Sequence, residues 1–162
     1  MLVEGKITFI GAGVMAEAMI AGVIRDGVAP AECIIAASPR LKRGNDLRKK
    51  YSIESEVDNV IAVNDADIVV LSVKPQHLKA VLPELKSKLK PQALILSIIA
   101  GATIEQISKG IDNPNVVRSM PNTPAQIGEG ITVWTASPTV TEKQRQMASQ
   151  IIAALGDEVF LE

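Results

Sequence analysis

Short apolar runs with strand character alternate with helical patterns along almost the whole chain. The apolar runs lie at residues 7–10, 33–37, 66–73, 93–100 and 115–120. Between most of them, apolar residues recur every three or four positions, as on one face of an amphipathic helix. Strands that alternate with helices favour a mostly parallel sheet with helices on both faces. The pattern therefore predicts an α/β fold of the doubly wound class.

Four further segments sharpen this prediction. The run ADIVVLSV at 66–73 is apolar and rich in β-branched residues, which is typical of a parallel strand buried on both faces. Residues 76–89 carry leucines and valine at helical spacing, although Pro83 is expected to kink or split that helix. Thr103 is a suitable N-cap for a short helix that ends at residue 111. An amphipathic helix is expected at 141–156, followed by a closing strand.

The composition excludes several classes of protein. The chain has 162 residues, 47% hydrophobic and 22% charged, as expected for one globular domain. A net charge of -1 and 2% aromatic residues offer no surface suited to nucleic acid or an anionic membrane. One cysteine and one histidine allow neither an internal disulfide nor a cysteine- or histidine-rich metal site. We expect a soluble, cytoplasmic protein without a leader, a metal or a membrane span.

A glycine-rich loop, GAGVMA at residues 11–16, follows the first strand and opens the first helix. It fits the pattern G-x-G-x-x-G/A, with Gly11 at the tight turn, Gly13 where a backbone approaches a diphosphate, and Ala16 where helix and strand pack closely. The helix N-terminus offers N–H groups and a partial positive charge to phosphates. This context predicts a Rossmann-type dinucleotide site, the alternative being a tight turn without a ligand.

The end of the second strand bears on the choice of dinucleotide. An NAD site places an acid there, about 20 residues beyond the loop, to bind the ribose 2′-OH. Here the segment reads AASPRLKR, with a hydroxyl at Ser38 and a guanidinium at Arg40 in place of an acid. Both groups suit a 2′-phosphate, which favours NADPH, while NADH stays possible. The alternative is a solvated helix start, which fits Lys42 and Arg43 better than Arg40.

Three other stretches follow strands at their carboxyl ends. They are SVKPQ at 72–76, SIIAG at 97–101 and RSMPNTPAQIGEG at 118–130. Ligands of doubly wound sheets bind beyond the carboxyl ends of the strands. We therefore expect these stretches to converge on the same crevice as the glycine-rich loop.

Together with the loop, these stretches resemble the pyrroline-5-carboxylate reductase family over essentially the whole chain. Gly11, Gly13, Met15 and Ala16 fit the family's G-x-G-x-M-A core, and VKPQ and MPNTP match as they stand. Val14 departs from the pattern, because the family usually has asparagine there. The resemblance implies NAD(P)H-dependent reduction of 1-pyrroline-5-carboxylate to L-proline, the last step of proline biosynthesis.

The resemblance also implies which residues surround the two small molecules. Those implied for the cofactor are Gly11, Ala12, Gly13, Val14, Met15, Ala16, Ser38, Arg40, Asn59, Ser72, Val73, Lys74, Pro75, Ala100 and Gly101. Those implied for the substrate pocket are Met120, Pro121, Asn122 and Thr123. It implies no metal and identifies no catalytic group within this chain.

Within that set, the resemblance assigns each segment a part of the cofactor. Residues 11–16 would hold the diphosphate, Ser38 and Arg40 the 2′-phosphate, and residues 72–75 the nicotinamide ribose. Asn59 would lie near the adenosine, although it is equally suited to capping the helix that follows. Residues 100–101 would lie by the nicotinamide. For Lys74 the alternative to a role in cofactor binding is that it is an ordinary surface cation.

Chains of this family continue into a helical domain that dimerises and completes the substrate pocket. We therefore expect residues 1–162 to be a single NADP-binding domain, inactive alone, whose full-length form is a homo-oligomer through the helical domain. Two alternatives stay open. One is another NADP-dependent imine or β-hydroxyacid reductase. The other is a non-enzymatic, nucleotide-sensing Rossmann module.

Overall fold

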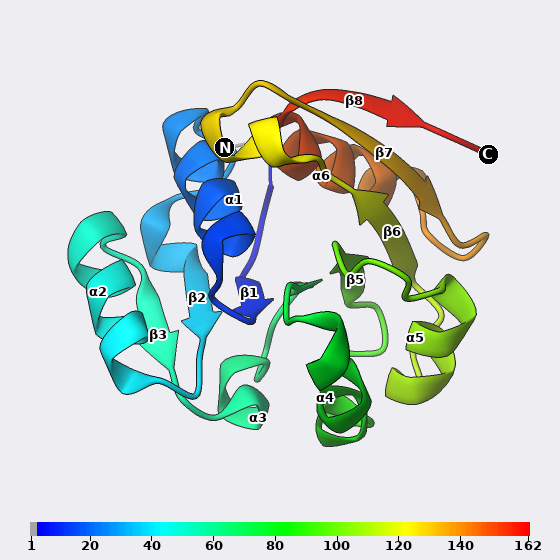
Figure 1. Ribbon diagram of the computed structural model, residues 1–162. Helices are drawn as coiled ribbons and strands as arrows, with labels where there is room; N and C mark the ends of the chain where they lie inside the picture. The colour runs from blue at the N-terminus through cyan, green and yellow to red at the C-terminus, as the bar shows by residue number, and fades with distance from the viewer. Residues whose placement is uncertain (1–2) are drawn as a thin grey trace.

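Eight strands form one sheet in the computed structural model, which describes residues 3–162 (Figure 1). In chain order they are β1 (Ile7–Ile10), β2 (Ile34–Ala37), β3 (Glu54–Glu56), β4 (Ile68–Leu71), β5 (Leu94–Ser97), β6 (Val116–Met120), β7 (Gly130–Ala136) and β8 (Gly156–Phe160). Their spatial order is β3-β2-β1-β4-β5-β6-β7-β8. Met1 and Leu2, which the predicted domain includes, lie outside the described residues.

The strand pairing confirms the predicted doubly wound, mostly parallel sheet. Every neighbouring pair is parallel except β6 and β7, which run antiparallel, with Met120 opposite Val133. The tight antiparallel pair arises because the connection from β6 to β7 contains no long helix, whereas parallel neighbours need a crossover. The chain therefore reverses at this point and resumes a parallel crossover to β8.

Within residues 3–162, six α-helices connect and cover the strands. They are α1 (Val14–Arg25), α2 (Leu41–Tyr51), α3 (Asn59–Ala62), α4 (Leu78–Leu85), α5 (Ile104–Ile111) and α6 (Glu142–Ala153). Three 3-10 turns complete the set: η1 (Ala31–Cys33), η2 (Pro75–His77) and η3 (Thr123–Ile127). Buried side chains of α1, α2 and α6 pack in one core cluster, and those of α3, α4 and α5 pack in a second. The sheet separates these two clusters, as a three-layer arrangement requires.

Successive side chains of the central strands point to opposite faces of the sheet and so contribute to both core clusters. On β4, Ile68 and Val70 join the first cluster, while Val69 and Leu71 join the second. All four side chains are fully buried, which confirms the predicted strand buried on both faces. Thr8 on β1 is also fully buried, and its hydroxyl donates to the carbonyl of Ala62 at 2.8 Å. A polar side chain is accommodated there because its hydrogen bond replaces those lost to water.

Two sequence predictions need correction. The single helix expected at 76–89 is in fact η2 followed by α4, which ends at Leu85. Pro83 lies inside α4 and has no N–H to donate, so the helix stops within a turn of it. The helix expected at 141–156 also ends early, because α6 stops at Ala153 and Gly156 is the first residue of β8. The Thr103 cap is confirmed, since its hydroxyl accepts from the Gln106 N–H at 3.1 Å.

Within residues 3–162, no helix combines the length and the apolarity that a membrane crossing requires.

Candidate functional site

The order of the strands creates a crevice beside β1. From β1 the chain crosses to β2 on one side, and β4 lies on the other side. Loops that leave such a switch point diverge, so the carboxyl ends of the strands enclose a ligand-sized space. A groove of about 910 Å³ lies there, lined by the loops after β1, β2 and β4 and by parts of α3 and α4. Its lining residues are Gly11, Ala12, Gly13, Ala37, Ser38, Pro39, Arg40, Val57, Asp58, Asn59, Val60, Ser72, Val73, Lys74, His77, Ala80, Val81 and Glu84.

The glycine-rich loop has the geometry that its sequence predicts. Gly11 has a φ of +102°, and a Cβ there would lie 2.7 Å from backbone atoms of Ser72 and Val73, so only glycine fits without strain. A Cβ on Gly13 would meet nothing within 4 Å, which leaves that backbone open on the groove side. Ala16 is 1% exposed and packs α1 onto the sheet. Each of the three positions thus has its expected structural role.

The start of α1 leaves backbone N–H groups unpaired beside the groove. Within residues 3–162, no acceptor pairs with the backbone N–H groups of Gly13 and Val14. The first turn of a helix leaves such groups unsatisfied and carries a partial positive charge. The open backbone at Gly13 therefore gives a diphosphate direct access to these donors, and the residues present fit a dinucleotide.

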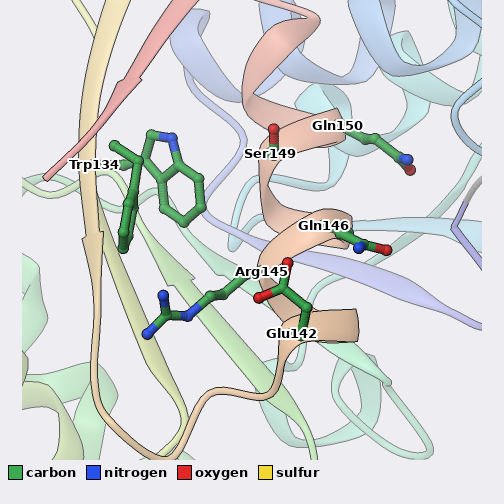
Figure 2. A pocket seen from close by; sticks show the side chains of 7 residues that line it. Trp134, Glu142, Arg145, Gln146, Ser149 and Gln150 are labelled. Atoms are coloured by element: carbon green, nitrogen blue, oxygen red, sulfur yellow. The ribbon is translucent and has the colours of Figure 1, made fainter. Parts of the chain in front are cut away.

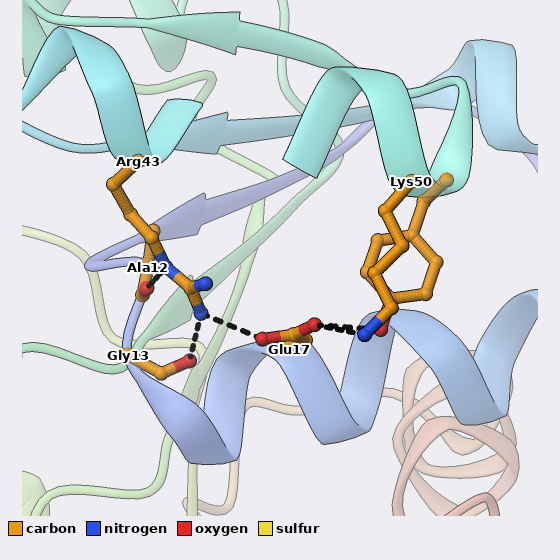
Figure 3. A network of polar contacts seen from close by, with 6 residues as sticks. Ala12, Gly13, Glu17, Arg43 and Lys50 are labelled. Carbon is orange, nitrogen blue, oxygen red and sulfur yellow. Dashed lines mark hydrogen bonds and ion pairs between the residues drawn. The ribbon is translucent and has the colours of Figure 1, made fainter. Parts of the chain in front are cut away.

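A polar network behind the loop was not foreseen from the sequence (Figure 3). Arg43 on α2 donates to the carbonyl of Ala12 at 2.7 Å and to Glu17 at 2.8 Å. Lys50 and Tyr51 donate to the other oxygen of Glu17 at 3.0 and 2.8 Å. Arg43 was expected at a solvated helix start, which is wrong because three acceptors on and beside the loop occupy its guanidinium.

The network determines the charge of Glu17. Burial favours the neutral acid and would raise the pKa of Glu17, but hydrogen bonds from Arg43, Tyr51 and Lys50 outweigh it and lower that pKa to about 2. The carboxylate is thus ionised at neutral pH. Burial raises the pKa of the Tyr51 phenol, and its hydrogen bond to Glu17 adds to that shift.

Ser38 and Arg40 meet at the end of β2 as the sequence predicts. The Ser38 side chain is 5% exposed, and its Oγ accepts from the backbone N–H of Arg40 at 3.2 Å. This leaves the Ser38 hydroxyl proton available for another acceptor. The Arg40 side chain has no ion-pair partner among the described residues. The pair therefore presents two free donors to the groove, both suited to a phosphate.

Asn59 lines the far wall of the groove at the first residue of α3. The helix is capped by Asp58, whose side chain accepts from the N–H groups of Val60 and Ile61. The alternative that Asn59 serves as the cap is therefore wrong. Its Nδ2 instead donates to Glu84 of α4 at 2.9 Å, which leaves its carbonyl oxygen as a free acceptor.

The structure leaves part of the predicted set outside the groove. Residues 72–74 line it, but Ala100 and Gly101, after β5, do not. Residues 120–123 also lie outside its lining, and the Met120 side chain is 49% exposed. Val14, Met15, Ala16 and Pro75 adjoin lining residues without lining it themselves. The lining of the groove thus includes residues implied for the adenosine, the diphosphate and the nicotinamide ribose, and none of those implied for the nicotinamide ring or the substrate.

A second, smaller hollow lies between α6 and the β7–β8 edge (Figure 2). It measures about 340 Å³ and shares no lining residue with the groove. Trp134 and Phe160 form a tilted aromatic pair there, and the Arg145 guanidinium lies 5.1 Å from the centre of the Phe160 ring. Trp134 and Ser149 both donate to Glu158, so these polar groups are already paired. The arrangement stabilises the packing of α6 on the sheet.

Comparison with known proteins agrees with this geometry. The model of the family described as NADP oxidoreductase coenzyme F420-dependent matches residues 6–101. A pyrroline-5-carboxylate reductase of Pseudomonas aeruginosa is 40% identical over 97% of this chain. A pyrroline-5-carboxylate reductase of Bacillus subtilis is 34% identical over 95% of it. The chain spans 58% and 52% of the length of these two relatives.

Solved structures extend the comparison to the fold. A pyrroline-5-carboxylate reductase of Coxiella burnetii superposes with a TM-score of 0.93 at 34% identity, over 98% of this chain and 59% of the other. The NADP-bound pyrroline carboxylate reductase of Plasmodium falciparum shares the fold, with a TM-score of 0.84 at 24% identity, over 98% of this chain and 58% of the other. The resemblance indicated by the sequence motifs is confirmed.

Proposed function

Because this chain belongs to the family of coenzyme F420-dependent NADP oxidoreductases, we propose that it is the cofactor-binding domain of a pyrroline-5-carboxylate reductase. The reaction is the reduction of 1-pyrroline-5-carboxylate to L-proline, with NADPH as the preferred hydride donor. The enzyme would act in the cytoplasm, in proline biosynthesis. Curated relatives of that name match 95–97% of this chain at 34–40% identity, which supports the proposal.

One observation carries the cofactor assignment. The glycine-rich loop and the Ser38–Arg40 pair line the same groove, at the switch point of the sheet. In this arrangement the N–H groups at the start of α1 bind the diphosphate, and Ser38 and Arg40 bind the 2′-phosphate. The Asn59 carbonyl accepts from the adenosine, while Val57, Val60 and Val81 provide apolar walls nearby.

The preference for NADPH follows from charge at the end of β2. An NAD site there would carry an acid that accepts from the ribose 2′-OH, and such an acid would repel a 2′-phosphate. Two acids line the groove elsewhere: Asp58 caps α3 and Glu84 accepts from Asn59. Arg40 has no ion-pair partner among the described residues, so its charge is available to a 2′-phosphate.

On the other side of the groove, residues 72–75 would lie beside the nicotinamide ribose and residues 100–101 beside the ring. The cofactor supplies the hydride, and the protein holds the imine against it. Residues 120–123 would border the imine pocket. Hydride transfer requires donor and acceptor carbons about 3–3.5 Å apart. We propose that the helical domain of the longer relatives completes this pocket and forms the homo-oligomer, so the 162-residue chain binds NADPH with little or no turnover.

The cofactor proposal is tested by titrating the chain with NADPH and NADH and following nicotinamide fluorescence. We expect NADPH to bind at least about tenfold more tightly. Arg40→Gln should remove this preference by weakening NADPH alone. Lys42→Gln is the matched control, since Lys42 lies two residues further on and does not line the groove. Equal or tighter binding of NADH by the unmodified chain would contradict the assignment.

The reaction is tested separately, by measuring NADPH consumption with pyrroline-5-carboxylate. We expect turnover from a longer protein that joins this chain to a helical domain like that of the relatives, and little from the chain alone. Binding of NADPH without turnover in the longer protein would favour the nucleotide-sensing alternative. Rapid reduction by the chain alone would show that the pocket needs no second domain.

A further inference from the structure

We infer that Arg43 is a positioning residue for the cofactor, which holds the carbonyl groups of the glycine-rich loop so that the loop's N–H groups face the groove. The inference rests on the proposed function, because it concerns the same nucleotide site. The loop motif ends at Ala16, so Arg43 lies 27 positions beyond it and outside any pattern that defines the loop.

The guanidinium of Arg43 contacts the loop from behind (Figure 3). Its Nε donates to the Ala12 carbonyl at 2.7 Å, and its Nη2 lies 3.3 Å from the Gly13 carbonyl. The same Nη2 donates to Glu17 at 2.8 Å. The planar fork of arginine thus joins two successive carbonyls of the loop to the first turn of α1, which a single point charge does less well.

Because the peptide unit is planar, a contact that fixes the direction of a C=O group also fixes the direction of the N–H group in the same peptide. In a trans peptide the C=O and the N–H point in opposite directions. A carbonyl of Ala12 that points at Arg43 therefore directs the N–H of Gly13 away from Arg43, and the carbonyl of Gly13 does the same for the N–H of Val14. The described chain provides no acceptor for either of these N–H groups. Gly13 has no side chain to restrain its backbone. Its carbonyl accepts from the Glu17 N–H at 3.0 Å as well as from Arg43, whereas the Ala12 carbonyl accepts from Arg43.

Charge provides a second reason for Arg43. Glu17 lies in the first turn of α1, close to where a diphosphate would bind. An uncompensated carboxylate there would repel the phosphates. The Glu17 side chain is 22% exposed and Arg43 is 24% exposed, so solvent screens their attraction only partly. Arg43 thereby compensates the charge of the acid in the first turn of α1.

A comparison with Lys50 distinguishes the positioning of the loop from a simple ion-pair bridge between α1 and α2. It also lies on α2 and pairs with Glu17, at 3.0 Å, but it makes no contact with the loop carbonyls. Its side chain is 66% exposed. A bridge between α1 and α2 would be weakened by removing either cation, whereas of these two cations only Arg43 contacts the loop carbonyls.

The experiment compares Arg43→Met, Lys50→Met and Arg40→Gln with the unmodified chain. Each is titrated with NADPH, with NADH and with adenosine 2′-monophosphate, which carries the 2′-phosphate but no diphosphate. For Arg43→Met we expect NADPH and NADH to bind about tenfold more weakly, by the same factor. Its affinity for adenosine 2′-monophosphate should stay within about twofold. Lys50→Met should bind all three as before, and Arg40→Gln should lose affinity for NADPH and adenosine 2′-monophosphate only.

Arg43→Lys keeps a cation opposite Glu17 but lacks the fork, and it replaces Arg43→Met if the methionine variant does not fold. We expect it to lose affinity for both dinucleotides in equal proportion. Unchanged dinucleotide binding by the Arg43 variants would overturn the inference. So would an equal loss in Lys50→Met, or a parallel loss of adenosine 2′-monophosphate. If the unmodified chain binds neither dinucleotide, the proposed function fails as well, which distinguishes the two failures.

Discussion

Two neighbouring regions of the sheet differ in how closely the loops at the carboxyl ends of their strands are packed against the rest of the chain. Around β1, β2 and β4, the loops enclose a groove and are tied down by backbone contacts and by Arg43. Beyond β5 and β6, residues 100–101 and 120–123 lie outside that groove. Gly101 has a positive φ like Gly11, yet a Cβ there would meet nothing within 4 Å.

This difference matches the two halves of the proposed reaction. A nucleotide is held by contacts that one domain can supply, because phosphates need only N–H groups and cations fixed in place. An imine carbon must be held against the nicotinamide from several sides. We therefore call the region around β1, β2 and β4 the nucleotide side, and the loops at 100–101 and 120–123 the open side.

The largest expected effect comes from adding one methyl group on each side. Gly11→Ala places a Cβ 2.7 Å from the backbone of Ser72 and Val73. It should lower the free energy of unfolding by about 3 kcal/mol or more. Gly101→Ala carries only the strain of a positive φ, with a cost of about 1 kcal/mol. Urea denaturation of both variants checks this, and equal losses would mean that the two loops are equally constrained.

The second prediction concerns charge on the nucleotide side. The pKa of Glu17 lies at about 2 in the folded chain, below its ordinary value of 4.5. Ionised Glu17 therefore stabilises the fold above pH 4.5, and this stability is lost as the pH falls towards 2. Because the side chain is partly exposed, the loss should be on the order of 2 kcal/mol.

Unfolding measured by circular dichroism between pH 5 and about pH 2.5 tests this against Glu17→Gln, which keeps the shape but not the titrating group. The variant should lack this part of the pH dependence. An identical pH profile for both proteins would contradict the role assigned to Glu17, whatever other carboxylates contribute.

The smallest expected effect distinguishes the two sides by nucleotide affinity. Asn59→Ala removes one acceptor from the groove and should weaken NADPH binding about three- to fivefold. Met120→Ala, on the open side, should leave NADPH affinity within about twofold. Both are measured by the same fluorescence titration. A larger loss for Met120→Ala would mean that the open side takes part in holding the nucleotide.

Much of the fold and part of the site follow from the sequence alone. Alternating apolar runs and helical patterns predict the parallel sheet, because burial on both faces demands continuous apolar strands. The glycine spacing predicts the turn at Gly11 and the close packing at Ala16, since both are local steric requirements. The pair at Ser38 and Arg40 was predicted for the same reason: its position relative to β2 is fixed within a few residues.

Other features were decided only by the tertiary structure. The contacts of Arg43 with Ala12 and Gly13, and of Asn59 with Glu84, join segments 25 to 31 residues apart. No local pattern specifies such pairs, because they depend on how α2 and α4 pack on the sheet. The lining of the groove includes residues after β1, β2 and β4 but none of residues 100–101 or 120–123, although all of these segments follow carboxyl ends of strands. The sequence determines which residues leave those ends, and the twist and order of the sheet determine which of them meet.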